Sequence, residues 1–345
     1  MKATMKQIAD LHGISVNAVS LALNNKPGVS DEMRSKILRT AEEIGYLENK
    51  DKFVRTFSRM NLCVMMQKKY SRDMNFYGRV LYAVVEEAKR NGYDILMNFF
   101  DDNNLEVPTM ISDHRVAGIV IIGKINDENI SKLQTYRIPI ILVDHASLTK
   151  SVDSILTDNK LGGFIITKYL IDKGFKKIGF FGDLNYSLSI KERFFGFKEA
   201  LDSFELNHGI VNMTLDEYIG KYSVTEDIEE AVLSNDINKM TECIKTIDQL
   251  PEVYICSNDK AAILLLSSLQ SLGYHAPNDI SVVGFDNIDM CEKINPKLTT
   301  VNVNKELMGK RAVQRLIYRI SHRDVVSENA VISVDLVERD SVQMP

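Results

Sequence analysis

The chain has 345 residues, 45% of them hydrophobic, and a formal net charge of −5. This length and apolar content predict two or three domains with substantial cores. No run approaches the ~18 apolar residues of a membrane span, and the N-terminus has no apolar signal region. These features argue against secretion and predict a cytoplasmic protein with no membrane partner.

The sequence contains no motif that is typical of an enzyme active site or of a metal site. The four cysteines are far apart and form no C-x-x-C pair, and neither they nor the six histidines have zinc-ligand spacing. The phosphate-binding loop, the dinucleotide fingerprint, the nucleophile elbow and the H-E-x-x-H motif are also absent. We therefore expect reduced thiols, no cofactor, no metal and no enzymatic activity.

The first patterned segment, residues 4–23, predicts two short helices joined by a tight bend. Ala9 is small enough to let the helices touch, Gly13 can adopt the positive φ of the bend, and Val19 fills the seam. This spacing is that of a helix-turn-helix. Thr4 and Ser15 are candidate caps, and the other apolar positions are Ile8, Leu11, Ala18, Ala22 and Leu23.

The second helix of this pair offers polar side chains for reading a major groove. Ser15, Asn17 and Ser20 fall on its outer face. Charge agrees, because residues 1–60 carry a net +3 and the remainder −8, so the N-terminal end suits phosphates. The alternative is an ordinary helical hairpin packed on a core.

A third helix is predicted after a loop at residues 24–30. Ser30 can cap it, an apolar stripe runs from Met33 to Ile44, and it ends at Gly45. Three helices in about fifty residues form a small domain with a thin core. We expect that domain to be marginally stable without DNA or a partner.

Residues 4–47 closely resemble the DNA-binding headpiece of the LacI/GalR family of transcription regulators. The resemblance rests on the T-x-x-x-I-A-x-x-x-G-I-S block that begins at Thr4 and on the A-E-E-I-G-Y block that ends at Tyr46. It implies that Val16 and Asn17 read base edges, since asparagine pairs bidentately with adenine and valine contacts the thymine methyl group. The expected DNA-contacting residues are Thr4, Ser15, Val16, Asn17, Ser20, Leu21, Asn24, Ser30, Tyr46, Asn49 and Arg55.

Two features depart from the family pattern. Leu21 stands where many relatives have an arginine that reads guanine, so a site with A·T contacts there is plausible. In the hinge, residues 49–60, only Asn49 matches, and Arg55 stands where relatives wedge a leucine into the minor groove. The alternatives are that Arg55 enters a narrowed minor groove, that a nearby phenylalanine is the wedge, or that the hinge stays disordered.

Beyond the hinge, short apolar runs alternate with amphipathic stretches. About nine Val/Ile/Leu-rich strands alternating with helices predict two doubly wound α/β units, with parallel sheets covered by helices on both faces. Ligands of such units bind beyond the carboxyl ends of the strands, between the lobes. The expected strands are 62–66, 94–98, 118–122, 140–143, 177–181, 253–256, 280–284 and 330–336, and the expected helices are 78–90, 160–172, 190–201, 237–246, 260–272 and 305–319.

The same region resembles the family's periplasmic-binding-protein-like effector domain. The R-x-x-G-F motif at Arg193 and the segments 256–259 and 279–286 stand at family landmarks. The resemblance implies a headpiece at 1–48, a hinge at 49–60 and an effector and dimerisation domain at 61–345. The expected lobes are about 61–159 with 302–328, and about 160–301 with 329–345.

The resemblance also implies a set of effector contacts, namely Phe76, Tyr77, Asp144, Arg193, Asn258 and Asp286. Arg193 and Asp286 suit a polyhydroxylated ligand, because a five-donor fork and a two-oxygen acceptor can together hold vicinal hydroxyls. A surface ion pair is the alternative for Asp144, and a place in the core is the alternative for Phe76. A sugar is favoured, while purines and phosphorylated sugars stay open.

These features together predict a sequence-specific transcription regulator that acts as a repressor. We expect it to bind a near-palindromic operator as a homodimer. Ligand closure of the lobes would change operator affinity by about 1–3 kcal/mol. Whether the ligand releases or recruits the protein is open. The rival class is a sugar-binding solute receptor without DNA function, which would need a signal segment and no headpiece.

Overall fold

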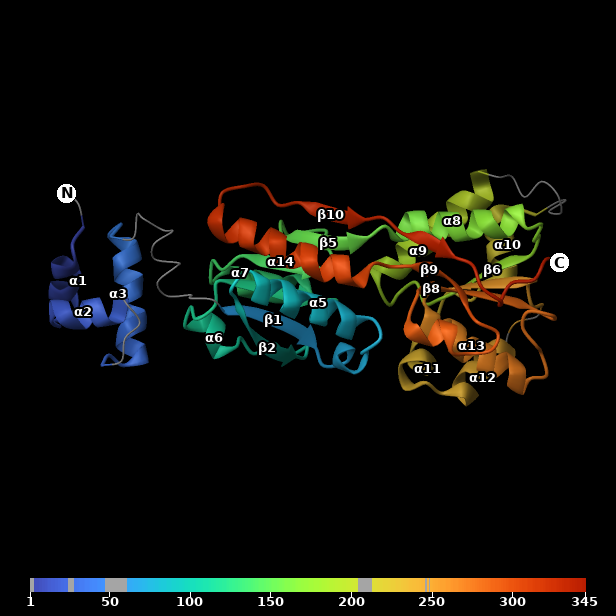
Figure 1. Ribbon diagram of the computed structural model, residues 1–345, viewed down its shortest axis with the longest axis horizontal. Helices are drawn as coiled ribbons and strands as arrows, with labels where there is room; N and C mark the ends of the chain where they lie inside the picture. Colours follow the sequence, from blue (N-terminus) through green and yellow to red (C-terminus); the bar gives the residue numbers. More distant parts are fainter. Residues whose placement is uncertain (1–2, 24–27, 47–60, 204–212, 246, 248) are drawn as a thin grey trace. The chain divides into compact units, whose positions relative to one another are not determined.

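A computed structural model describes residues 3–23, 28–46, 61–203, 213–245, 247 and 249–345 (Figure 1). The predictions for Asn24, Asn49 and Arg55, and those for the hinge, lie outside these residues. The chain forms two compact units. Unit 1 comprises Met1–Ile155 and Glu306–Ala330, and unit 2 comprises Leu156–Lys305 and Val331–Pro345.

The N-terminal part of unit 1 is a three-helix headpiece with helices α1 (Met5–His12), α2 (Val16–Leu23) and α3 (Asp31–Glu43). Its core is made of small and branched side chains from all three helices, because helices this short bury only a narrow stripe. The buried residues are Ile8, Ala9, Val19, Ala22, Leu23, Ile37 and Ala41.

The caps and the bend of the headpiece confirm the sequence analysis, with one exception. Thr4 forms a capping box with Gln7, and Gly13 ends α1 with φ 64°. Leu11, however, is 64% exposed. Leu11 therefore lies outside the apolar stripe on which the sequence analysis placed it, because only the stripe through Ile8 and Ala9 faces the other two helices.

Unit 1 also contains a six-stranded sheet with the order β10-β5-β4-β3-β1-β2. The pairings of β1 with β2 and β3, of β3 with β4 and of β4 with β5 are parallel. Close packing of α14 against the neighbouring helix α5 depends on Gly309, where a Cβ would lie 2.5 Å from the carbonyl oxygen of Val80. The strands are β1 (Asn61–Gln67), β2 (Asp94–Phe100), β3 (Gly118–Ile122), β4 (Ile140–Val143), β5 (Asp153–Thr157) and β10 (Asn329–Ile332), and the helices are η1 (Tyr70–Arg72), α5 (Tyr77–Arg90), α6 (Thr109–Ser112), α7 (Asp127–Gln134) and α14 (Lys305–Ser321).

Unit 2 has a five-stranded sheet with the order β11-β9-β8-β7-β6, parallel except for the antiparallel edge strand β11. One apolar core packs α12 and α13 against β7 and β8. The strands are β6 (Ile178–Phe181), β7 (Val253–Cys256), β8 (Ser281–Asp286), β9 (Thr299–Asn302) and β11 (Asp335–Val337). The helices are α8 (Asn159–Asp172), α9 (Leu188–Ser203), α10 (Leu215–Tyr222), α11 (Glu229–Ser234), α12 (Ile237–Lys245), α13 (Asp259–Ser271) and η2 (Asp289–Glu292).

The doubly wound architecture is as predicted, but the element list needed corrections. The predicted strand 330–336 is two strands, β10 and β11, which belong to different sheets. The break falls at Ser333 and Val334, just after the chain passes from unit 1 to unit 2. Strands β5 and β9 and helices α6, α7, α10 and α11 were not among the expected elements. They are short or carry polar residues that obscure the apolar period.

Arg34 of α3 holds the C-terminal end of α2. Its Nη1 donates to the carbonyl oxygens of Leu21 (3.2 Å) and Ala22 (3.1 Å), and its Nη2 donates to Val29 (3.4 Å). The last carbonyl groups of a helix have no partner within the helix, so a guanidinium there supplies the missing donors and complements the helix dipole.

We predict that Arg34→Ala lowers the free energy of local unfolding of α2 by about 2 kcal/mol, because hydrogen bonds from a charged group contribute about 1.5–3 kcal/mol. Amide hydrogen exchange in α2 of the full-length protein should accelerate about 30-fold, which is the same free energy expressed as a rate ratio. The exposed Arg39→Ala on the same helix is the control. Equal exchange rates in the two variants would contradict this role of Arg34.

Candidate functional site

The DNA-reading candidates lie on the exposed face of α2. Ser15 and Asn17 are exposed, and Val16 is 44% exposed although it is apolar. The Ser15 hydroxyl accepts a hydrogen bond from the backbone N–H of Ala18 at 3.0 Å, so it caps the helix. Val16 and Asn17 therefore present the exposed apolar and amide groups with which a helix can read bases.

The other headpiece candidates have partly structural roles. The hydroxyl oxygens of Thr4 and Ser30 accept from the backbone N–H groups of Gln7 and Met33, both at 3.3 Å, and so cap α1 and α3. Ser20 and Leu21 are half-buried on α2. Tyr46 packs partly buried against the headpiece core.

In unit 1, three candidate residues lie near the carboxyl end of β4 and the start of α5. The Tyr77 hydroxyl donates to Asp144 Oδ2 at 3.0 Å. Asp144 follows β4 with φ 58°, a left-handed conformation that aspartate tolerates better than most residues. Phe76 is 5% exposed, so its ring packs inside unit 1, where it meets the Tyr77 ring edge-on at 5.0 Å.

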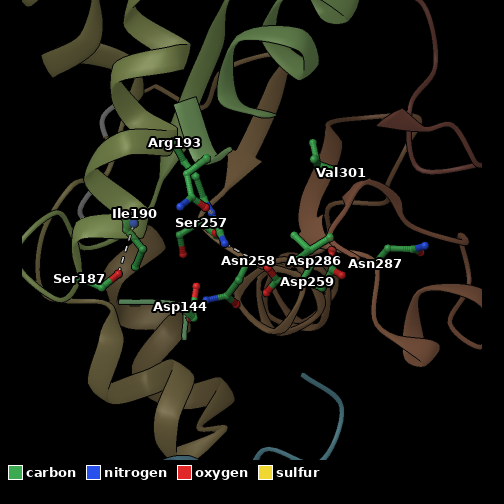
Figure 2. Close-up of polar contacts among 12 residues, drawn as sticks. Asp144, Ser187, Ile190, Arg193, Ser257, Asn258, Asp259, Asp286, Asn287 and Val301 are labelled. Carbon is green, nitrogen blue, oxygen red and sulfur yellow. Dashed lines mark hydrogen bonds and ion pairs between the residues drawn. The ribbon is translucent and has the colours of Figure 1, made fainter. Parts of the chain in front are cut away.

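In unit 2, the Arg193 guanidinium is the centre of a buried polar network (Figure 2). Arg193 is 6% exposed. Its Nε donates to Asn159 Oδ1 at 2.9 Å, its Nη1 to the Ser257 carbonyl oxygen at 2.5 Å, and its Nη2 to Asp286 Oδ1 at 3.1 Å. Its Cζ lies 3.7 Å from the centroid of the Phe285 ring. A guanidinium has five N–H donors, so two of them remain for a ligand.

Asp286 and Asn287 form a corner directly after β8. Both residues have positive φ, 111° and 53°, a conformation that costs free energy and persists only when neighbours hold it. The Asn287 side chain accepts from Arg339 Nη2 at 2.8 Å and donates to Asn302 Oδ1 at 3.0 Å. The corner therefore fixes the direction of the Asp286 carboxylate.

Lys305 stabilises this corner and was not among the predicted site residues. The residue is buried, and its ammonium group donates to the carbonyl oxygens of Asp286, of Asn287 at 3.3 Å and of Val303 at 3.1 Å. A lysine at the start of a helix is normally read as a surface residue, so its sequence carries no signal of this role.

Asn258 starts α13 at the end of β7. Its Oδ1 accepts the Ala261 N–H at 2.9 Å as a helix cap, which leaves the amide nitrogen for a ligand. The next residue, Asp259, was also missed. It is fully buried, with Oδ2 accepting the Ile288 N–H at 2.9 Å and Oδ1 accepting the Thr300 hydroxyl at 2.6 Å.

Among the residues that the structure describes, no group of three or more histidine, cysteine or acidic side chains could hold a metal ion. No helix in the same part of the chain is long and apolar enough to cross a membrane.

Two family models match the chain. Residues 4–49 match the model of bacterial regulatory proteins of the lacI family, and residues 167–342, half of the chain, match the periplasmic binding protein-like domain. The chain belongs to the LacI family of effector-controlled, DNA-binding transcriptional regulators and is not an enzyme.

Relatives along the full length support this assignment. The chain is 29% identical over 352 aligned positions to the HTH-type transcriptional repressor PurR of Mannheimia succiniciproducens, and 28% identical to that of Vibrio vulnificus, each covering 99% of both proteins. The lac repressor dimer bound to operator has the same fold, with 19% identity, a TM-score of 0.67 and 99% of both chains covered. A LacI-family regulator from Enterococcus faecium with bound ribose has a TM-score of 0.69 at 22% identity over 83% of this chain and 99% of that one.

Asp259 should make stability depend on pH. Burial, and secondly the nearby Asp286 carboxylate, raise the pKa of Asp259 from 3.8 to about 7. Because the folded state holds this proton more tightly than the unfolded state, the contribution to the free energy of unfolding is fully present below pH 3.8 and is lost as pH rises to about 7.

We predict that Asp259→Asn reduces this loss of stability with rising pH, because the asparagine side chain has no proton to release. The difference in melting temperature between the variant and the wild type should shift in favour of the variant as pH rises from about 5 to about 8. Calorimetry across this range measures it, with the exposed Asp202→Asn as the control. A constant difference would show that Asp259 titrates normally.

Proposed function

We propose that this regulator reads its operator with Val16 and Asn17 of α2 and responds to a sugar or sugar derivative that contacts Arg193 and Asp286. The observation that carries the proposal is the Arg193 network. A buried guanidinium held by three acceptors, with two N–H donors left beside a fixed carboxylate, is preorganised for hydroxyl groups.

Structural neighbours support a sugar as the effector class. A ribose is bound to the Enterococcus faecium regulator, cellobiose to the regulator CelR, and D-xylulofuranose to a LacI-type protein from Alkaliphilus metalliredigens. In this proposal Tyr77 and Asp144 are the contacts that unit 1 offers, and the Asn258 amide is a third contact from unit 2. Phe76 contributes by supporting Tyr77, because its own ring is buried.

The organisation that we propose has a headpiece at 1–48, a hinge at 49–60 and an effector domain at 61–345. A headpiece this small contacts a half-site, so the regulator acts as a homodimer on a near-palindromic operator, and its place of action is the cytoplasm. A solute receptor without DNA function would have no use for the exposed Val16 and Asn17 pair.

We predict that Asn17→Ala weakens operator binding about 10- to 100-fold, because a bidentate base contact contributes about 1–3 kcal/mol of discrimination. The operator is first selected from a random duplex library with the wild-type protein, and fluorescence anisotropy then measures affinity for it and for a random duplex. Affinity for the random duplex and its salt dependence should not change, since Asn17 is neutral. The exposed Glu43→Gln is the control. Equal wild-type affinity for all duplexes would overturn the DNA assignment.

We also predict that Asp286→Ala weakens sugar binding at least about tenfold, because it removes a charged acceptor and frees one side of Arg193. A thermal-shift screen of the full-length protein with D-ribose, cellobiose and D-xylulose identifies a ligand, since a binder of the native state raises the melting temperature. Titration calorimetry of wild type, Asp286→Ala and the control Asp202→Ala then compares affinities. Unchanged affinity in Asp286→Ala would exclude this site.

A further inference from the structure

A polar cavity of about 180 Å³ lies in unit 1, and none of the candidate effector residues lines it. Its wall includes the first residues of β4 and β5, so it opens at the amino edge of the sheet, whereas Asp144 follows the carboxyl end of β4. Residues at the end of α7 and at and just after the end of α14 line the other sides. In Figure 1 the loop between α14 and β10 lies at this end of the sheet. The polar side chains that line it are Gln134, Arg137, Ser151, Asp153, Arg319 and Arg323.

The charge of this cavity is positive. Asp153 is the one carboxylate among the lining residues, and it is 1% exposed. Its Oδ1 already accepts hydrogen bonds from Arg315 Nε at 2.6 Å and from the Glu328 backbone N–H at 3.1 Å, and neither Arg315 nor Glu328 lines the cavity. The cavity wall therefore carries three guanidinium groups, from Arg137, Arg319 and Arg323, against one carboxylate. That carboxylate is already paired with a fourth guanidinium, from Arg315.

Contacts on two sides hold the Arg319 guanidinium in place. Its Nε lies 3.0 Å from Asp153 Oδ2, and its Nη1 donates to the Val325 carbonyl oxygen. Within the described residues its Nη2 meets no acceptor, so both N–H groups on that nitrogen remain available. A guanidinium that is already held by two contacts loses little side-chain entropy when it binds an oxyanion.

We propose that this cavity is a second ligand site, specific for a phosphoryl group. Three guanidinium groups on its walls suit a phosphate dianion, which has two negative charges and several acceptor oxygens. They suit a ligand with a single carboxylate less well. The volume is below that of a pocket for a drug-sized ligand, so the ligand is inorganic phosphate or a small phosphorylated metabolite. This cavity shares no lining residue with the proposed effector contacts in unit 2.

The test uses the double variant Arg137→Gln/Arg323→Gln in the full-length protein. Both side chains are exposed. The double variant removes two charges from the cavity and keeps Arg315 and Arg319, the two arginines that pair with Asp153. We expect inorganic phosphate, against sodium chloride of equal ionic strength, to raise the wild-type melting temperature, and the double variant to bind phosphate at least about tenfold more weakly by calorimetry. Arg90→Gln/Arg311→Gln, two exposed arginines on α5 and α14, is the matched control and should bind like the wild type.

Two further arms identify the source of the phosphoryl group and separate this site from the effector site. Ribose 5-phosphate that binds more tightly than inorganic phosphate, and is displaced by it, indicates a metabolite, while equal affinities indicate the free ion. Asp286→Ala should retain phosphate binding, because its site lies in unit 2. Absence of phosphate binding, or equal binding by the double variant, overturns the proposal. So does a double variant that lowers affinity for random duplex without affecting phosphate, since the arginines would then serve DNA.

Discussion

Burial of the Arg193 guanidinium is the constraint on which the candidate effector site depends. A cation away from water is costly unless acceptors surround it. Here the acceptors come from the start of α8, the end of β7 and the end of β8, and Arg193 itself comes from α9. One side chain thus ties the sheet of unit 2 to two helices that cover it. The two N–H groups of Arg193 without a partner in this network are therefore held in fixed positions.

The position of Arg193 is in turn set by two glycines. A Cβ on Gly163 of α8 would lie 2.0 Å from the Arg193 carbonyl oxygen, and a Cβ on Gly196 of α9 would lie 2.0 Å from that of Lys160. Any side chain at either position would separate the two helices and draw the guanidinium away from its acceptors. The glycine of the R-x-x-G-F motif is therefore a packing requirement of the site, even though it has no group that could contact a ligand.

Local sequence patterns predicted most of the fold, but they did not predict which charged residues are buried. Ile8, Gly13 and Val19 could be placed because a helix-turn-helix depends on residues within a few turns of one another. Arg193 and Asp286 could be named only through a motif. Asp259 and Lys305 could not be found, because each is buried by elements distant in sequence, and a charged residue alone favours an exposed position. The switch of the chain between sheets near Ser333 is likewise a tertiary event with no local signal.

The arginines at the amino edge of unit 1 are stable without a ligand, and this bears on what a ligand there would do. In a parallel α/β unit the helices run opposite to the strands, so the amino ends of strands lie beside helix C-termini, where carbonyl groups carry partial negative charge. Arg137 follows α7 and Arg323 follows α14, and both gain from that field. The cluster therefore does not need an anion to fold. An anion that binds only the folded state there would add stability that grows with the logarithm of its concentration above the dissociation constant, so the cavity would respond to changes in that concentration.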